Sequence, residues 1–241
     1  IVSNLDYDFS RFEKSWLTQV GVAVRTVILD EATMGFLRRN PGAVVINLGA
    51  GLDTRVERLQ GENLSAWYDL DIPEAIELRR NFFQENERVH FIAKSVFDLS
   101  WLDDVKTEDR PTLLIAEGFL MYFPEQELRP LFEKLAARFP GSEMLAELLA
   151  PLMVKGGKYH DSVNRIDGRA DFKWGPRDSV VLEKWCEGIE RLEEWNYFNF
   201  QKKRWKWMGR LGRAPLIGPL LSNRIARIRF PVRPAAGSAR G

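Results

Sequence analysis

The segment from Ala43 to Arg55 restricts the possible folds of this chain more than any other part of it. The six residues from Ala43 to Leu48 form a short, apolar, β-branched run, which is typical of a strand that is buried on both faces. Gly49-Ala50-Gly51 then turns the chain, and a helical pattern begins at Asp53. A buried strand followed by a glycine turn and a helix predicts an α/β fold with a mainly parallel sheet.

The rest of the chain supports this prediction, because strand and helix patterns alternate up to about residue 150. The predicted helices cover residues 11–39, 74–85 and 125–139, and the further strands cover 66–71, 89–93, 112–117 and 143–149. Two later segments, 189–200 and 224–232, are expected to return to the sheet as a closing pair. A length of 241 residues suits one such domain with an embellishment.

Acidic residues follow three of the predicted strands. Asp71 ends the second strand, Asp98 and Leu99 follow the third, and Glu117 ends the fourth. The carboxyl ends of parallel strands meet at one edge of a sheet, where ligands bind. An acid after the second strand can accept hydrogen bonds from a ribose, and an acid beside an apolar residue suits an adenine. The pattern predicts a site for an adenosine-containing cofactor, in which Asp69 is secondary because only Asp71 lies at the rim.

The glycine turn favours S-adenosylmethionine over NAD as that cofactor. It lacks the third glycine of the dinucleotide pattern and places Asp53 where a pyrophosphate would bind. A carboxylate there repels phosphates and can accompany a sulfonium and an amino group. An NAD-dependent enzyme remains an alternative.

Three strings of residues resemble the leucine carboxyl methyltransferase family, in particular its bacterial branch, which includes polyketide O-methyltransferases. They are Asn47-Leu48-Gly49-Ala50-Gly51-Leu52-Asp53-Thr54-Arg55, Tyr68-Asp69-Leu70-Asp71-Ile72-Pro73 and Ala116-Glu117-Gly118-Phe119-Leu120-Met121-Tyr122. The resemblance implies a Rossmann-like class I methyltransferase fold. This fold has a mostly parallel seven-stranded sheet with helices on both faces and a C-terminal insertion or lid.

The resemblance also implies roles for particular residues. Arg25 would pair with the methionine carboxylate, and Glu117 would lie near the methionine amino group. Asp71 would bind the ribose, and the adenine would contact Asp98 and Leu99. The other expected cofactor-binding residues are Gly49, Gly51 and Asp53.

The expected reaction is methyl transfer to an oxygen atom of a small molecule, which includes the carboxylate of a polyketide-like compound. A carboxylate acceptor is ionised at neutral pH and needs no strong base. Tyr122 is expected to face the acceptor, and His160, next to Asp161, is a candidate base for a phenol or an alcohol. On this reading residues 1–40 form a helical cap, 43–150 the cofactor-binding core, 151–215 a substrate lid and 216–241 a closing strand and tail.

Composition limits the other functions. The net charge of +1 gives no argument for a nucleic-acid partner, and no apolar run reaches the ~20 residues of a membrane span. The single cysteine, Cys186, indicates a reducing compartment, so a cytoplasmic location is expected. With two histidines and one cysteine, no metal site is expected.

One segment allows a different function. Basic and aromatic residues interleave from Lys202 to Trp207, which can contact RNA or an anionic membrane surface. The alternative hypothesis is therefore a non-catalytic binding module with a methyltransferase-like fold. The simpler interpretation is a solvated helix whose tryptophans pack inward.

Overall fold

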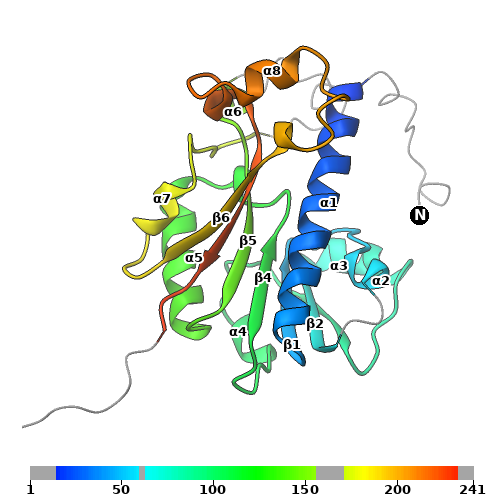
Figure 1. Ribbon diagram of the computed structural model, residues 1–241. Coiled ribbons are helices and arrows are strands. Elements are labelled where there is room, and N and C mark those ends of the chain that lie inside the picture. The colour runs from blue at the N-terminus through cyan, green and yellow to red at the C-terminus, as the bar shows by residue number, and fades with distance from the viewer. Residues whose placement is uncertain (1–14, 60–62, 156–170, 233–241) are drawn as a thin grey trace, which may run out of the picture.

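The computed structural model describes residues 15–59, 63–155 and 171–232. Its centre is a seven-stranded sheet with strand order β3-β2-β1-β4-β5-β7-β6 (Figure 1). In chain order the strands are β1 (Ala43–Leu48), β2 (Leu64–Asp71), β3 (Val89–Ala93), β4 (Thr112–Ala116), β5 (Glu143–Leu148), β6 (Glu190–Asn196) and β7 (Arg224–Arg229).

Neighbours among β1 to β5 pair in parallel, whereas β7 is antiparallel to both β5 and β6. The predicted fold class is confirmed: the sheet is mostly parallel and the two late segments close it. Because β7 lies between β5 and β6 and opposes both, β6 runs in the same direction as β1 to β5. The chain that leaves β6 therefore emerges at the same edge as the glycine turn.

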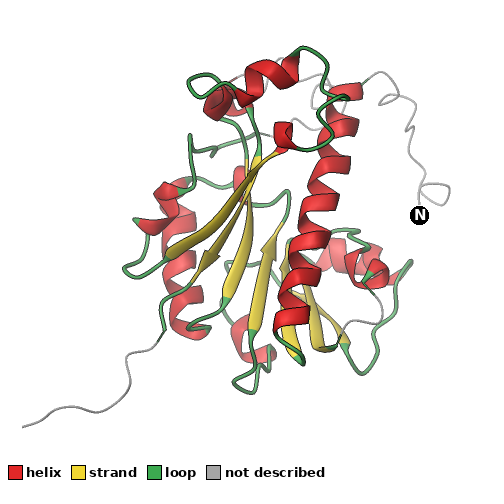
Figure 2. Cartoon of the chain, viewed as in Figure 1, coloured by secondary structure: helices red, strands yellow, loops and turns green. Residues whose placement is uncertain are grey.

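Helices cover both faces of the sheet, as predicted (Figure 2). One face packs against α1 (Trp16–Arg39) and α3 (Pro73–Arg80), and the other against α4 (Trp101–Asp104), α5 (Glu125–Arg138) and α7 (Val180–Glu183). The remaining helices are α2 (Arg55–Arg58), α6 (Pro151–Lys155), α8 (Met208–Arg213), α9 (Gly218–Leu221) and the 3-10 helices η3 (Leu120–Tyr122) and η6 (Tyr197–Asn199).

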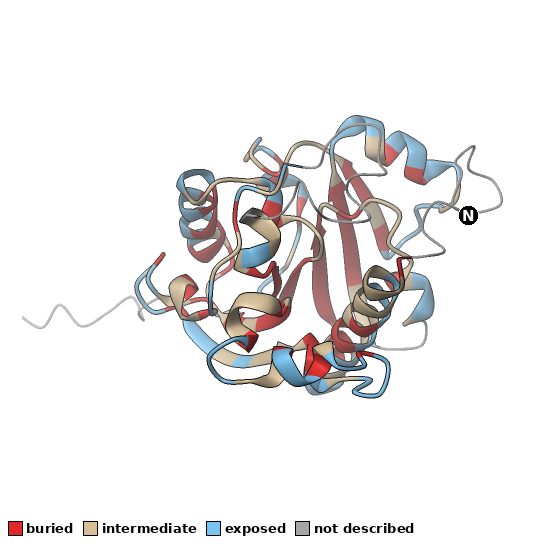
Figure 3. Ribbon diagram, turned by 90° about the horizontal axis from the view of Figure 1, so that it is seen from above, coloured by how far each residue is buried: buried red, intermediate tan, exposed pale blue. Residues whose placement is uncertain are grey.

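Strand β1 shows why the sheet needs cover on both sides. Val44 and Ile46 pack with the α4–α5 side, whereas Ala43 and Val45 pack with the α1 side, and every residue of β1 is buried. Alternate residues of a strand point to opposite faces, so a continuously apolar strand is stable only between two layers. Figure 3 shows the same burial across the central strands.

Two local predictions were wrong. The predicted helix over 74–85 is α3, which ends at Arg80, after which the chain turns. The Lys202–Trp207 segment is a series of turns and not a helix. Gln201 and Lys206 have left-handed φ angles of 47° and 51°, which interrupt helical hydrogen bonding, and only Trp205 packs inward while Trp207 is exposed.

No helix in the described ranges combines the length and the hydropathy that crossing a bilayer requires.

Asp69 and Arg79 form a fully buried ion pair beneath the glycine turn. Asp69 Oδ2 lies 2.7 Å from Arg79 NH2, and Asn47 and Trp67 also donate hydrogen bonds to Asp69. Arg79 NH1 donates in turn to the carbonyl of Gly51, at 3.0 Å. Asp69 is thus a structural residue whose ion pair with Arg79 supports the glycine turn.

We expect Asp69→Ala to lower the free energy of unfolding by about 3–5 kcal/mol, because it leaves the Arg79 charge buried without its partner. Urea unfolding measures this change. The control is Glu190→Ala, which removes an exposed ion pair with Arg229 and should cost about 1 kcal/mol or less. Equal losses in the two variants would contradict the structural role of Asp69.

Candidate functional site

The glycine turn after β1 leaves its backbone open on one side. Gly49 and Gly51 have φ angles of +68° and +47°, which L side chains rarely adopt. A Cβ atom on Gly49 would lie 2.5 Å from the Phe119 ring, whereas a Cβ atom on Gly51 would meet nothing within 4 Å. Gly49 is therefore required for packing, and Gly51 borders open space.

Asp71 lies directly beside this open backbone. Its Oδ2 accepts a hydrogen bond from the Gly51 amide at 2.8 Å, and its Oδ1 accepts one from the Ile72 amide at 2.8 Å. The residue is only partly buried. The structure thus brings together Gly49, Gly51 and Asp71, as the sequence predicted, at the carboxyl edge of the sheet.

Arg55 connects three elements around the turn. Its side chain is 1% exposed, and its guanidinium contacts Asp30 of α1 at 2.9 Å, Asp53 of the turn at 2.5 Å and Glu117 after β4 at 2.6 Å. Burial of Arg55 opposes its charge, but the three carboxylates more than offset this and its pKa is raised.

Asp53 is consequently held by interactions within the protein. Besides the contact with Arg55, it accepts hydrogen bonds from the Arg55 amide and from Asn47. Burial raises the pKa of Asp53, and the neighbouring Arg55 opposes that rise. Asp53 is therefore not a free anion that could repel a pyrophosphate by itself, because it is paired with the buried guanidinium of Arg55.

Arg25 and Glu117, which are both expected near the methionine part of the cofactor, are neighbours in the structure. Arg25 Nε lies 2.8 Å from Glu117 Oε1, and Arg25 NH1 donates to Glu147 Oε2 at 3.1 Å. Burial lowers the pKa of Arg25, but the charges of Glu147 and Glu117 outweigh burial and the net shift is upward, so the group stays cationic. Arg25 Nε is buried and forms an ion pair with Glu117, but this contact does not have the geometry of a hydrogen bond.

Glu147 is the main residue that sequence reasoning missed. It is 2% exposed near the end of β5, and it accepts hydrogen bonds from the Gly118 amide at 2.6 Å and the Tyr197 hydroxyl at 2.8 Å. Burial, and then the charge of Glu147, raise the pKa of Tyr197 well above its ordinary value. The available signal for Glu147 was an acid between apolar residues near the carboxyl end of a predicted strand. Arg55 is the last residue of the Asn47–Arg55 string, but its sequence position alone indicated no contact with Asp30 or Glu117.

A cavity of about 270 Å³ begins at this cluster. Its floor includes Arg25, Gly118 and Glu147, and its walls are mainly apolar side chains of α1, η6 and the segment that leads to α9. Tyr122, which is expected to face the acceptor, lines this cavity and packs on Phe172 with ring centroids 5.5 Å apart. Burial raises the pKa of Tyr122, so its hydroxyl stays protonated at neutral pH.

The remaining predicted residues have simpler surroundings. Asp98 is exposed and accepts a hydrogen bond from the Ser100 amide, and hydrogen bonding by Ser100 lowers the pKa of Asp98. Leu99 is half-buried against the core. His160 lies outside the described residues. The cofactor and catalytic roles of all these residues stay predictions.

Sequence comparisons relate this chain to known proteins. The sequence profile described as leucine carboxyl methyltransferase matches residues 10–136. The tetracenomycin polyketide synthesis O-methyltransferase TcmP of Streptomyces glaucescens is 32% identical over 81% of this chain and 72% of its own length. The S-adenosyl-L-methionine-dependent methyltransferase dpfgK of Gibberella zeae is 35% identical over 59% of this chain, and the match spans 51% of its own length.

Solved structures show the same fold. The N-methyltransferase NodS from Bradyrhizobium japonicum, in complex with S-adenosyl-L-homocysteine, matches 95% of this chain and 94% of its own with a TM-score of 0.54. The sequence identity is 11%, so this likeness concerns the fold alone.

The two glycines of the turn provide a matched test. We expect Gly51→Ala to keep the fold but to weaken binding of S-adenosylhomocysteine by at least about tenfold, or ~1.4 kcal/mol, because its Cβ enters the open space. Gly49→Ala should mainly reduce stability, by a further ~1–3 kcal/mol relative to Gly51→Ala, because its Cβ collides with Phe119. Calorimetric titration and urea unfolding measure the two effects, and unchanged affinity in Gly51→Ala would exclude this surface from the cofactor site.

Proposed function

The chain belongs to the leucine carboxyl methyltransferase family, and on that premise we propose that it methylates an oxygen atom of a small, largely apolar acceptor. Its class is that of an S-adenosylmethionine-dependent methyltransferase, and its cofactor is S-adenosylmethionine. The observation that carries the proposal is the apolar cavity that begins at Arg25, Gly118 and Glu147.

The residues at the sheet edge fit the cofactor. Around Arg55, four carboxylates (Asp30, Asp53, Glu117, Glu147) face three guanidinium groups (Arg25, Arg55, Arg58), an excess of one negative charge. S-adenosylmethionine carries a net positive charge at neutral pH, whereas a dinucleotide pyrophosphate is negative. The charge of the whole cluster, and not of Asp53 alone, therefore favours S-adenosylmethionine over a dinucleotide.

We assign each part of the cofactor to a residue that offers it space, a hydrogen bond or an opposite charge. Gly51 leaves space for it, and Asp71 at the rim would accept hydrogen bonds from the ribose. Arg25, whose guanidinium stays cationic, would pair with the methionine carboxylate, and Glu117 is close enough to the same place to receive the amino group. Asp98 and Leu99 would contact the adenine.

When bound, the cofactor supplies a sulfonium methyl group that is already a good electrophile. The protein's task is to hold an acceptor oxygen in line with that methyl group and to exclude water. Aromatic and aliphatic walls exclude water, and the Tyr122 hydroxyl, which is protonated at neutral pH, would donate a hydrogen bond that orients the acceptor.

A carboxylic acid of polyketide-like character fits these surroundings. Among the described residues that line the cavity none is a histidine, and a carboxylate needs no base because it is already ionised. The similarity to a polyketide O-methyltransferase supports the same acceptor class.

The ribose assignment is tested with Asp71→Asn. We expect it to weaken cofactor binding by about tenfold, because an amide replaces a charged acceptor that also holds the Gly51 amide. Asp103→Asn, an exposed acid on α4, is the control and should bind normally. Isothermal titration measures both, and equal affinities would remove Asp71 from the site.

The acceptor is tested with paired aromatic compounds that carry either a carboxyl or a phenol group on the same ring system, with a labelled methyl donor. We expect the carboxylates to be methylated faster. Tyr122→Phe should raise KM for the acceptor severalfold with little change in kcat, because the hydroxyl orients the acceptor without taking a proton. Methylation of the phenols alone, or of nitrogen compounds alone, would contradict the proposed acceptor.

A further inference from the structure

The segment that roofs the cavity has an unusual charge. Between Trp195 and Ser222 the sequence contains six lysines and arginines and no acid, although the whole chain has a net charge of only +1. This segment alone therefore carries a formal charge of +6. We call residues 200–217 of this segment the cationic cap.

The cap lies at the ligand edge of the sheet. Because β6 runs parallel to β1 to β5, the chain beyond Asn196 continues past the carboxyl ends of the strands. Figure 1 shows α8 at this end, together with α6 and the first turns of α1. The inner side of the cap, which includes Trp205 and Met208, lines the cavity.

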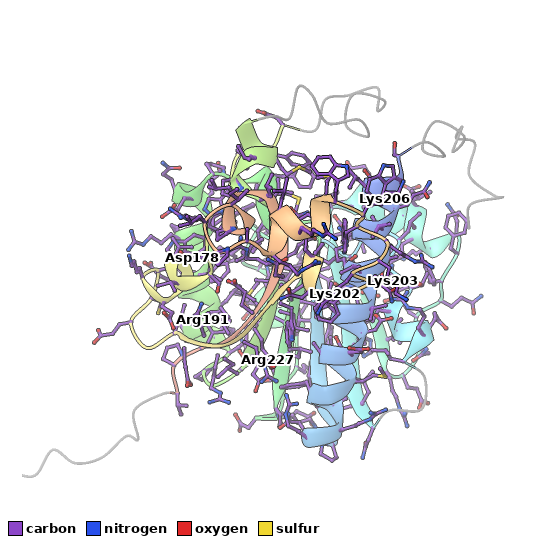
Figure 4. The ribbon with its side chains drawn as sticks, turned by 45° about the horizontal axis from the view of Figure 1, so that its top comes forward. Asp178, Arg191, Lys202, Lys203, Lys206 and Arg227 are labelled. Carbon is purple, nitrogen blue, oxygen red and sulfur yellow. The ribbon has the colours of Figure 1, made fainter. Side chains whose placement is uncertain are left out.

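The outer side of the cap carries the charges. Lys202, Lys203, Arg204, Lys206 and Arg210 are all exposed. Figure 4 shows Lys202, Lys203 and Lys206 on the turns in front of the upper part of α1. Lys206 also contacts the protein itself, since its ammonium lies 4.7 Å from the centroid of the Trp16 ring.

Large apolar side chains are exposed on the same segment. Trp207 is 67% exposed and Leu216 is 78% exposed. Leu211 and Ile217 are also exposed, as is Leu152 of α6, which packs against α9. Large apolar side chains that are exposed together among cations are the kind of surface that marks an interaction site, and a partner with both apolar and anionic character would suit this one.

We propose that the cationic cap docks on the surface of an anionic lipid bilayer. Headgroup phosphates attract the lysines and arginines, and the acyl boundary receives the tryptophan and the aliphatic side chains. Interfacial Trp flanked by Lys and Arg is the composition that such surfaces favour. The protein then binds peripherally, with the roof of the cavity against the lipid.

Single-stranded RNA fits this surface less well. RNA-binding surfaces present several aromatic rings on which successive bases stack. Here the exposed apolar groups are one tryptophan and several aliphatic side chains, and Trp205 is buried. Aliphatic side chains are stabilised when they leave water and enter the acyl boundary of a bilayer. They cannot stack on RNA bases as aromatic rings do.

The test is co-sedimentation of the full chain with vesicles of phosphatidylcholine alone or with about one third phosphatidylglycerol. We expect binding to the anionic vesicles only, and a decrease in high salt because screening weakens the attraction. The variant K202E/K203E/R210E should bind at least about tenfold more weakly, since each basic residue near an anionic surface contributes to binding. It leaves Lys206 and its contact with Trp16 intact.

A charge-matched variant distinguishes the effect of this surface from the effect of the protein's net charge. R88E/K106E/K134E makes the same change in charge at exposed positions elsewhere and should bind normally. W207S/L216S should also weaken binding, most clearly in high salt, where the apolar contribution remains. Circular dichroism and S-adenosylhomocysteine binding confirm folding of each variant, so the result does not depend on the proposed acceptor.

Three results would overturn the proposal: equal binding to neutral and anionic vesicles, equal loss in the two charge variants, or binding to single-stranded RNA without binding to vesicles.

Discussion

The buried guanidinium of Arg55 is the interaction on which the rest of the site depends. It joins Asp30 of α1, Asp53 of the glycine turn and Glu117 after β4, three segments that are far apart in sequence. Removing one arginine from water is costly, and an isolated buried charge would not be stable. Three carboxylates offset this cost together, so the α1 helix, the turn and the end of β4 are fixed relative to one another.

The same network sets the electrostatics of the ligand edge. Arg25 extends it to Glu117 and Glu147, and Tyr197 completes it through its hydroxyl. The excess of carboxylates over guanidinium groups gives the edge a negative character suited to a cationic methyl donor. On the opposite side of the cavity, the cationic cap carries the positive charge, so the roof and the floor of one cavity differ in sign.

Periodicity and motif spacing predicted most of the fold. The limits of β1, β3 and β5 agree with prediction to within a residue, because buried strands are short, apolar and bounded by glycine, proline or charge. The glycine turn and Asp71 were likewise visible, because their function lies in local backbone geometry. The structure of residues 201–207 was not visible, because two left-handed residues that are not glycine decide it and no residue type marks them.

The sequence by itself determined the order of the strands and helices, the open glycine turn and the acids that follow the strands, because each depends on residues close together in the chain. Only the tertiary structure decided how those acids are used. It turned Asp53 toward Arg55, and it brought Glu147 beneath Arg25, from which it is separated by 122 positions. Long-range ion pairs depend on which helices and strands become neighbours in the fold, and local sequence patterns do not specify those neighbours.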